Sequence, residues 1–139
     1  EYDASAARAT NISIAASNVN GTVVGPGETF SANAAIGKRT TANGFVTAPV
    51  FISGEHAMGI GGGVCQVSST IYASLKTAGI KATERHPHSL PVNYLPSGWD
   101  ATISWGTLDF KFVNPYDSNM VVYTTANNGI LTAALYLQN

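Results

Sequence analysis

The single cysteine of this chain, Cys65, lies in a glycine-rich motif that could make its thiol a nucleophile. Three glycines at positions 61–63 precede it and let the backbone turn tightly and approach another group closely. The following residues, up to Leu75, are predicted to form a helix, so Cys65 falls at or near a helix N-terminus. Unpaired backbone N–H groups and the helix dipole favour negative charge there, which promotes the thiolate. The alternative is a buried structural cysteine in a glycine-rich turn.

Histidine and aspartate residues downstream of the cysteine supply the partners that a thiol nucleophile needs. His86 and His88 lie within residues 85–89, and Asp100 and Asp109 follow. Many thiol acyltransferases and peptidases place the cysteine on a helix, the histidine on or near a strand and the acid on the next strand. The histidine would take the thiol proton and later protonate the leaving amine, and the acid would fix the imidazole tautomer. Because many sequences contain this order, it does not by itself identify an enzyme.

Other polar and aromatic residues near the cysteine each have a functional and an ordinary interpretation. Arg85 could hold a substrate carboxylate with its guanidinium fork, or form an ion pair with Glu84 or an aspartate. The amide of Gln66, or its backbone N–H with that of Cys65, could form an oxyanion hole, whereas the alternative is a glutamine on the helix surface. Three aromatic residues could form a wall that binds sugars or peptides, or could belong to the core: Tyr94, Trp99 and Trp105.

The histidine pair also raises the question of a metal. His86 and His88 would point to the same face of a strand, and Cys65 could be a third ligand. Zinc sites usually have denser cysteine and histidine patterns, and Pro87 predicts a kink that lets the two histidines diverge. We therefore expect no metal and no cofactor, and at least one of the two histidines is expected to be an ordinary core or turn residue. His56, in the loop before the glycines, is expected to be a surface residue.

The composition predicts one globular domain. The chain has 139 residues, of which 45% are hydrophobic and 11% are charged, enough for one core and small for two. Its net charge of -1, without a basic run, argues against nucleic acid and anionic lipid as partners. No apolar run approaches the ~18 residues of a membrane helix, so we expect no membrane insertion. Because the chain begins at Glu1 without a methionine, we expect residues 1–139 to be a single domain excised from a longer protein.

Periodicity and turn residues predict an α+β fold. Helices are expected at residues 3–19 and at about 64–78, the second with four apolar residues on one face: Val64, Val67, Ile71 and Leu75. Residues 28–43 are expected to be irregular, with Phe30 and Ile36 anchored in the core, and residues 53–63 to form a glycine-rich loop. The N-terminal helix and the cysteine-bearing helix would pack on a mostly antiparallel β-sheet.

The strands of this sheet are expected mainly in the second half of the chain. Residues 80–85 are expected to be extended, and Pro49 would confine its strand to an edge or a bulge. The residues Asn127-Asn128-Gly129 predict a hairpin. The predicted strands are residues 22–24, 45–52, 92–95, 101–105, 109–113, 120–125 and 131–137.

Several motifs of the chain resemble the VanW-domain family, which is named from vancomycin-resistance gene clusters. The most specific is Gly61-Gly62-Gly63-Val64-Cys65-Gln66-Val67-Ser68-Ser69-Thr70-Ile71-Tyr72. The others are Asn20-Gly21-Thr22-Val23-Val24, Pro26-Gly27-Glu28-Thr29-Phe30-Ser31, Ile36-Gly37-Lys38-Arg39-Thr40, Glu84-Arg85-His86-Pro87-His88-Ser89 and Gly98-Trp99-Asp100-Ala101-Thr102. The resemblance covers the chain from about residue 10 to residue 137.

The resemblance implies an exported, extracellular protein of the bacterial cell envelope, often attached to other extracellular domains. The family has been linked to L,D-transpeptidation of peptidoglycan through the cysteine of the glycine-rich motif. Carried over to this chain, Cys65 becomes the nucleophile, His88 the best candidate base and Asp100 its acidic partner. The expected partner is a peptidoglycan stem peptide, and the candidate substrate-binding or oxyanion residues are Gly62, Gly63, Gln66, Arg85, Ser89 and Tyr94.

Two other functions remain open at the level of the sequence. A thiol amidase or carboxypeptidase acting on stem peptides would use the same residues with water as the acceptor, because the acceptor depends on the shape of the site and on water exclusion. A non-catalytic module that binds peptidoglycan would use the glycines and aromatic residues for binding, and Cys65 would then be structural.

Overall fold

The computed structural model describes residues 7–52, 55–88, 95–96 and 98–138. The helices are α1 (Ala7–Val19), α2 (Ala32–Ile36), the 3-10 helix η1 (Thr41–Asn43) and α3 (Val64–Thr77). The strands are β1 (Thr22–Val24), β2 (Thr29–Ser31), β3 (Thr47–Ile52), β4 (Glu55–Ile60), β5 (Lys111–Val113), β6 (Met120–Asn127) and β7 (Ile130–Leu137). The described residues combine helices with antiparallel strands, which confirms the predicted α+β class.

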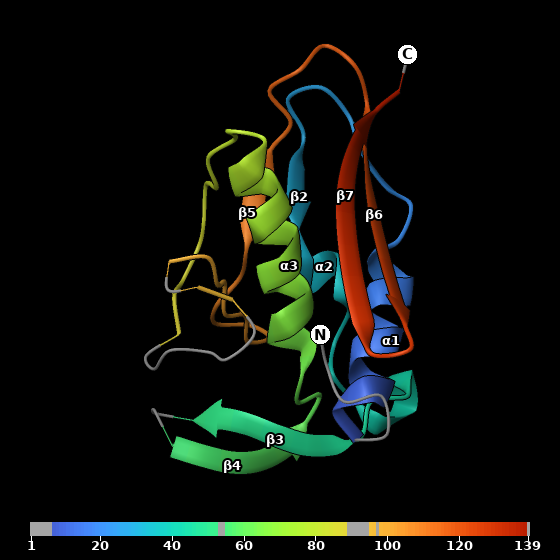
Figure 1. Ribbon diagram of the computed structural model, residues 1–139, viewed down its shortest axis with the longest axis vertical. Coiled ribbons are helices and arrows are strands. Elements are labelled where there is room, and N and C mark those ends of the chain that lie inside the picture. Colours follow the sequence, from blue (N-terminus) through green and yellow to red (C-terminus); the bar gives the residue numbers. More distant parts are fainter. Residues whose placement is uncertain (1–6, 53–54, 89–94, 97, 139) are drawn as a thin grey trace.

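Two helices and a three-stranded sheet form the main body of the domain. β6 lies between β1 and β7 and pairs with both in antiparallel fashion. α1 packs against β6 and α3 against β7, and the two helices also contact each other (Figure 1). The strand pairs β2–β5 and β3–β4 are two further antiparallel sheets. The helices therefore pack on an antiparallel sheet as predicted, but the described strands form three sheets and not one.

The cysteine-bearing helix has the apolar face that its sequence predicts. Its buried residues include all four that the spacing places together: Val64, Val67, Ile71 and Leu75. They join one core cluster with Ile12 of α1 and Phe110. The helix begins at Val64, so Cys65 is its second residue and lies in the first turn. No helix in the described part of the chain is long and apolar enough to span a membrane.

Two turn-level predictions are also confirmed. Asn127 pairs with Ile130 across the β6–β7 hairpin, and the turn residues Asn128 and Gly129 have φ values of 51° and 81°. Two successive positive φ values are the geometry that an Asn-Gly hairpin turn requires. Within the described residues, β3 pairs only with β4, so Pro49 lies on an edge strand as expected.

The predictions for two stretches before the cysteine are wrong. Residues 28–43 form β2, α2 and η1, because side chains of Ser31 and Thr40 accept hydrogen bonds from the first turns of α2 and η1. Phe30 and Ile36 are buried as expected. Residues 55–60 form β4 and not a loop, because the backbone pairs with β3 along its full length.

The stretch after Asp100 is also predicted wrongly, since residues 101–105 form no strand. Their backbone N–H groups have partners other than a neighbouring strand: Ser69 Oγ for Ala101, the carbonyl of His86 for Thr102 and the sulfur of Cys65 for Ile103. The predicted strand 92–95 lies almost entirely outside the described residues.

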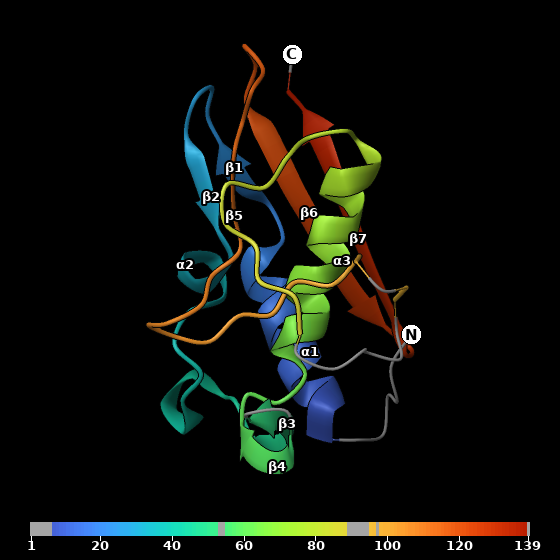
Figure 2. The ribbon, with the colours of Figure 1, turned by 90° about the vertical axis from the view of Figure 1, so that its left-hand side faces the viewer.

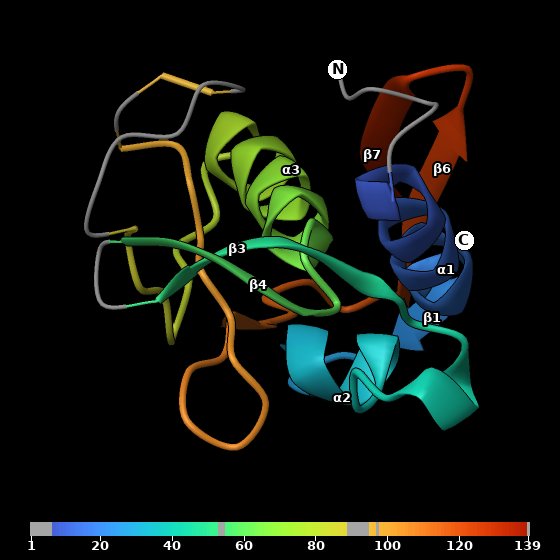
Figure 3. The ribbon, with the colours of Figure 1, turned by 90° about the horizontal axis from the view of Figure 1, so that it is seen from below.

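Two coil segments bring the remaining site residues to α3. Figure 2 shows residues 80–88 in yellow and the segment after residue 98 in orange crossing the N-terminal half of this helix. The Thr102 N–H donates to the carbonyl of His86 at 2.7 Å, which joins the two segments. The β3–β4 pair lies across the end of the molecule at which α3 begins (Figure 3), and β4 leads directly into this helix.

Candidate active site

A tight glycine turn carries the chain from β4 into α3 and sets the position of Cys65. Gly61 and Gly63 have φ values of 88° and 109°, in the region that favours glycine. A Cβ atom at Gly61 would lie 2.6 Å from Cγ of Arg39, and one at Gly63 would lie 3.3 Å from the backbone oxygen of Arg8. Both the backbone conformation and the close packing therefore require glycine at these two positions. Without side chains there, the turn can place the start of α3 directly against Arg39 and Arg8.

A buried asparagine of α1 holds the same turn in place. The amide nitrogen of Asn11 donates to the carbonyl oxygens of Gly62 and Val46, each at 2.9 Å. Its side-chain oxygen accepts from the backbone N–H of Val46, also at 2.9 Å. A fully buried amide must satisfy its donors and acceptor within the protein, and Asn11 does so entirely through this turn and the chain before β3.

Two serines after the cysteine attach α3 to the segment that follows Asp100. The buried hydroxyls of Ser68 and Ser69 donate to the carbonyl of Ala101 at 2.7 and 3.1 Å. Ser69 Oγ also accepts from the Ala101 N–H at 2.8 Å. This serine clamp, Ser68 and Ser69 on Ala101, brings Asp100 and Thr102 to the N-terminal end of the helix.

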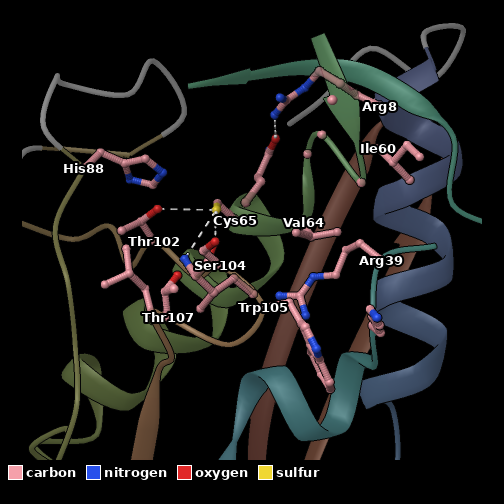
Figure 4. Close-up of a pocket in the computed structure, with 18 residues that line it drawn as sticks. Arg8, Arg39, Ile60, Val64, Cys65, His88, Thr102, Ser104, Trp105 and Thr107 are labelled. Atoms are coloured by element: carbon pink, nitrogen blue, oxygen red, sulfur yellow. Dashed lines mark hydrogen bonds between the residues drawn. The ribbon is translucent and has the colours of Figure 1, made fainter. Parts of the chain in front are cut away.

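The sulfur of Cys65 lies among hydrogen-bonding groups of residues 102 and 103. It is 3.5 Å from the Thr102 hydroxyl and 3.4 Å from both the N–H and the carbonyl oxygen of Ile103 (Figure 4). The carbonyl accepts from a neutral thiol, whereas the N–H and the hydroxyl can donate to a thiolate. The groups around the sulfur can therefore hydrogen-bond both the thiol and the thiolate.

His88 connects the cysteine to Asp100. Its Nδ1 lies 2.7 Å from Asp100 Oδ2, and its backbone N–H donates to the same oxygen at 2.6 Å. The side chains of His88 and Asp100 are only 8% and 10% exposed. With Nδ1 facing the carboxylate, Nε2 is the nitrogen that can serve the sulfur. Cys65, His88 and Asp100 thus come together in the order that the sequence predicts, although the last two lie in coil and not on strands.

The electrostatics of this group favour a thiolate and an imidazolium. Burial alone would raise the pKa of the Cys65 thiol, but hydrogen bonds from His88, Ile103 and Thr102 outweigh it and lower the pKa. For His88, burial lowers the pKa, and the hydrogen bonds to Cys65 and Asp100 and their charges raise it above the ordinary value. Burial raises the pKa of Asp100, but hydrogen bonds from His88 lower it overall.

Arg85 supports this carboxylate and does not line the cavity described below. Its Nε donates to the carbonyl of Asp100 at 2.9 Å, and its Nη2 lies 3.4 Å from Asp100 Oδ1. The guanidinium carbon also lies 4.9 Å from the ring centre of Tyr72. Of the two interpretations of Arg85, the geometry matches the ion pair with an aspartate, so Arg85 positions Asp100.

His86 and Asp109 belong to a different set of contacts. His86 Nε2 lies 2.9 Å from Glu84 Oε2, so the two histidines diverge around Pro87 as predicted. The carboxylate of Asp109 accepts from the hydroxyl of Ser31 and from the backbone N–H of Asn33. In the part of the chain that the structure describes, no three histidine, cysteine or acidic side chains are arranged to hold a metal.

Cys65 lies on the wall of a cavity of about 580 Å³, a size typical of small-ligand sites. The cavity runs between the start of α1, the end of β4, the glycine turn and the loop 102–108. Of the predicted site residues, the described ones that line it are Gly62, Gly63, Cys65, Gln66 and His88. The other charged residues of the described wall are all cations: Arg8, Lys38 and Arg39.

Comparison with known proteins gives the family. The sequence model described as "VanW like protein" matches residues 7–136. The chain belongs to the VanW family. It is 41% identical over 129 residues to "Uncharacterized protein YoaR" of Bacillus subtilis (strain 168), covering 93% of this chain and 43% of that protein. It is 27% identical over 123 residues to "Vancomycin B-type resistance protein VanW" of Enterococcus faecalis (strain ATCC 700802 / V583), covering 85% of this chain and 45% of that protein.

This VanW-family chain therefore spans less than half the length of these two relatives. No solved structure matches it. The resemblance that the sequence motifs indicate is thus confirmed at the level of the family.

Several predicted site residues have partners that bear on their roles. The buried side-chain oxygen of Gln66 accepts from Arg8 Nη2 at 3.2 Å, and the Gln66 N–H donates to the carbonyl of Gly63 at 3.0 Å. Gln66 is therefore not a surface glutamine. Trp99 lies against Lys76, with Nζ 4.6 Å from its ring centre, and does not line the cavity, whereas Trp105 does. Ser89 and Tyr94 lie outside the described residues, as does the side chain of His56.

The structure adds cavity residues that the sequence analysis does not single out. Thr102 and Ile103 contact the sulfur, and Arg39 forms part of the wall. A signal for two of them exists, because Arg39 and Thr102 lie inside motifs that resemble the VanW family. Only the fold reveals their role, since both are far from Cys65 along the chain.

Proposed function

We propose that this domain is a cysteine acyltransferase of the L,D-transpeptidase type that forms 3–3 cross-links between peptidoglycan stem peptides. The observation that carries this proposal is the arrangement of His88 between Cys65 and Asp100, with the Nδ1–Oδ2 distance of 2.7 Å and both side chains nearly buried. A thiol, an imidazole and a carboxylate in this order form the working group of many thiol acyltransferases.

In the first step, the thiolate of Cys65 attacks the carbonyl carbon of the third residue of a donor tetrapeptide and forms a C–S bond. The His88 imidazolium gives its proton to the nitrogen of the fourth residue, the C–N bond breaks and D-alanine leaves as an amine. The lowered pKa of the thiol and the raised pKa of the imidazole both favour the protonation states that this step requires.

In the second step, the side-chain amine of another stem peptide attacks the thioester. The neutral His88 takes a proton from this amine, the C–S bond breaks and the thiolate of Cys65 returns. A cysteine suits this exchange because a thioester reacts readily with amines and the thiolate is a good leaving group. Asp100 keeps the imidazole oriented through both steps and stabilises its charged form.

Membership of the VanW family supports the proposal. The family also supports an exported protein of the bacterial envelope in which this domain is attached to other extracellular domains. One relative carries the words vancomycin B-type resistance in its name. We propose the same setting for this chain, with stem peptides as partners and with no cofactor in the reaction.

The test is to incubate the domain with a stem tetrapeptide and an excess of an acceptor stem peptide, and to separate the products by mass spectrometry. The proposal predicts 3–3 dimers from the wild type and none from Cys65→Ala. Tripeptide without dimers would instead indicate a thiol amidase or carboxypeptidase. No product, with equal peptidoglycan binding by both proteins, would indicate a non-catalytic binding module.

A further inference from the structure

The wall of the cavity away from His88 is positively charged. Arg8, Lys38 and Arg39 line the cavity, and no aspartate or glutamate is among its described lining residues. In the view of Figure 4, Arg39 and His88 lie on opposite sides of Cys65. A substrate whose carbonyl carbon reaches the sulfur therefore meets cations on the side opposite the imidazole.

Arg39 is the cation of this wall that is held in a fixed position. Its Nη2 donates to the side-chain oxygen of Asn33 at 2.7 Å, and its Nη1 donates to the carbonyl of Gly37 at 3.0 Å. The guanidinium carbon lies 5.9 Å from the ring centre of Trp105. Its alkyl chain packs on Gly61, where a Cβ atom would come within 2.6 Å. A charged group that is fixed before the ligand arrives loses less entropy on binding.

The other two cations are less suited to a specific contact. Arg8 donates to the side-chain oxygen of Gln66 at 3.2 Å, and Lys38 is exposed. Lys38 would contribute to the general attraction of anions, while a planar guanidinium can hold both oxygens of a carboxylate. Arg39 is therefore the residue from which we expect selectivity.

The hydrogen-bond acceptors of the Arg39 guanidinium are neutral oxygens. Burial lowers its pKa, and the charges of Cys65 and Asp109 raise it, so the negative groups that act on Arg39 are a thiolate and a nearby carboxylate. Asp109 itself accepts hydrogen bonds from Ser31 and Asn33. Because the hydrogen-bond acceptors of the guanidinium carry no charge, a carboxylate of the bound donor can pair with it before acyl transfer, and this carboxylate departs with the leaving D-alanine.

We propose that Arg39 is a specificity-determining residue that binds the terminal carboxylate of the donor stem peptide. In a tetrapeptide attacked at its last peptide bond, only the amide nitrogen and one Cα separate this carboxylate from the scissile carbonyl carbon. A guanidinium at this place selects donors with a free C-terminus and disfavours internal peptide bonds. The identity of the ligand rests on the proposed acyl transfer, whereas the anion preference around Cys65 does not.

A pair of alkylating reagents tests the anion preference without any enzyme activity. Iodoacetate and iodoacetamide react with the same sulfur and differ in carrying a carboxylate or a neutral amide. The ratio of their rate constants at Cys65 cancels any change in the thiolate fraction. Arg39→Gln should lower the iodoacetate to iodoacetamide ratio by roughly tenfold, as expected for loss of one charge-assisted hydrogen bond, and Arg39→Lys should keep part of it.

Lys81→Gln is the matched control, because it removes the same charge from an exposed residue that does not line the cavity, and it should leave the ratio unchanged.

A second measurement uses only the wild type and so does not depend on how the variants fold. N-acetyl-D-alanine should protect Cys65 from iodoacetamide, and its C-terminal amide should not. The same contrast is expected between a tetrapeptide donor and its C-terminal amide in the rate of acylation.

The possible results separate this inference from the proposed function. An unchanged reagent ratio in Arg39→Gln, with equal protection by the acid and the amide, overturns the role of Arg39 even if stem peptides acylate Cys65. An Arg39-dependent preference for anions without any acyl adduct from tetrapeptides supports the anion subsite and overturns its assignment to a donor stem peptide.

Discussion

His86 and His88 each hydrogen-bond a carboxylate, yet only the second of these pairs reaches the cysteine. His86 Nε2 lies 2.9 Å from Glu84, and His88 Nδ1 lies 2.7 Å from Asp100. The side chains of the first pair are 38% and 32% exposed, and those of the second are 8% and 10% exposed. The same chemical pair, at nearly the same distance and two residues apart, therefore occupies two very different environments.

The difference shows what turns a histidine–carboxylate pair into a candidate catalytic group. Solvent screens the Glu84–His86 pair, and Glu84 also accepts from the Asp109 N–H at 2.9 Å and lies 3.7 Å from Lys111 Nζ, so it links the coil segment to β5. The Asp100–His88 pair is shielded from water and has a thiol on its far side. Burial opposes both shifts of pKa, but the hydrogen bonds and charges that link Cys65, His88 and Asp100 outweigh it, so the pKa of the thiol is lowered and that of the imidazole is raised.

The largest effect on the acylation rate is expected from removing His88, with removal of His86 as the comparison. His88→Ala should slow acylation of Cys65 by a stem peptide on the order of 10³-fold, because the base and the proton donor are both lost. His86→Ala, the matched control from the same segment, should change the rate by no more than about threefold, as expected for a partly exposed residue outside the site. Single-turnover kinetics followed by mass spectrometry measures both, and equal losses in the two variants would remove the distinction between the pairs.

Substitution of Asp100 should likewise slow acylation more than substitution of Glu84. Asp100→Asn is expected to lower the acylation rate on the order of 10²-fold, because the amide cannot stabilise an imidazolium as a carboxylate does. Glu84→Gln should leave the rate nearly unchanged. The same kinetic assay, with circular dichroism to check the fold of each variant, makes the comparison. A loss in Glu84→Gln as large as in Asp100→Asn would show that Asp100 has no special role beside His88.

The pH dependence should report the ion pair directly. Because the pKa of Cys65 is lowered and that of His88 is raised, the thiolate–imidazolium pair is more populated near neutral pH than it would be for the free side chains. Acylation should rise with pH as the thiol ionises and fall again as the imidazolium loses its proton. In His88→Ala, alkylation by iodoacetamide should need a higher pH, with about a tenfold loss at low pH for each unit by which the thiol pKa rises. His86→Ala, the control, should keep the wild-type pH profile. If His88→Ala keeps it too, His88 does not interact with the thiolate.

The smallest effect on activity is expected from the serine clamp. Ser69→Ala leaves the buried N–H of Ala101 without its partner, which should cost about 1–3 kcal/mol of unfolding free energy and slow acylation several-fold as Asp100 shifts. Ser74→Ala is the matched control, because that hydroxyl donates only within α3, to the carbonyl of Ile71 at 2.7 Å. Denaturant unfolding and acylation rates, measured together, test it. Equal effects of the two substitutions would mean that the clamp does not position the site.

The parts of the fold that the sequence predicts are those in which local pattern and final packing agree. The apolar residues of α3 recur three and four apart and are buried, and the Asn128-Gly129 turn requires the φ values it has. Residues 101–105 have the composition of a strand, but the backbone bonds to Ser69, His86 and Cys65 take the place of strand pairing. These bonds join positions distant in the chain, so no local pattern reveals them.

The candidate site shows the same division. Cys65, His88 and Asp100 can be proposed from residue type and order, because their chemistry is distinctive. Arg39 cannot, since its place in the cavity depends on the close approach of Gly61, 22 residues later in the numbering. Arg85 has the right chemistry for a substrate carboxylate, but in the fold its guanidinium is bound to Asp100.

The nucleophilic role of Cys65 is tested most directly by the intact mass of the domain after incubation with a stem tetrapeptide in the absence of an acceptor. We expect an increase equal to the mass of the tetrapeptide minus D-alanine. The adduct should lie on the peptide that contains Cys65, react with hydroxylamine as a thioester does, and be absent from Cys65→Ala. An unmodified wild-type protein under conditions in which the tetrapeptide is shown to bind would contradict the assignment of Cys65 as the nucleophile.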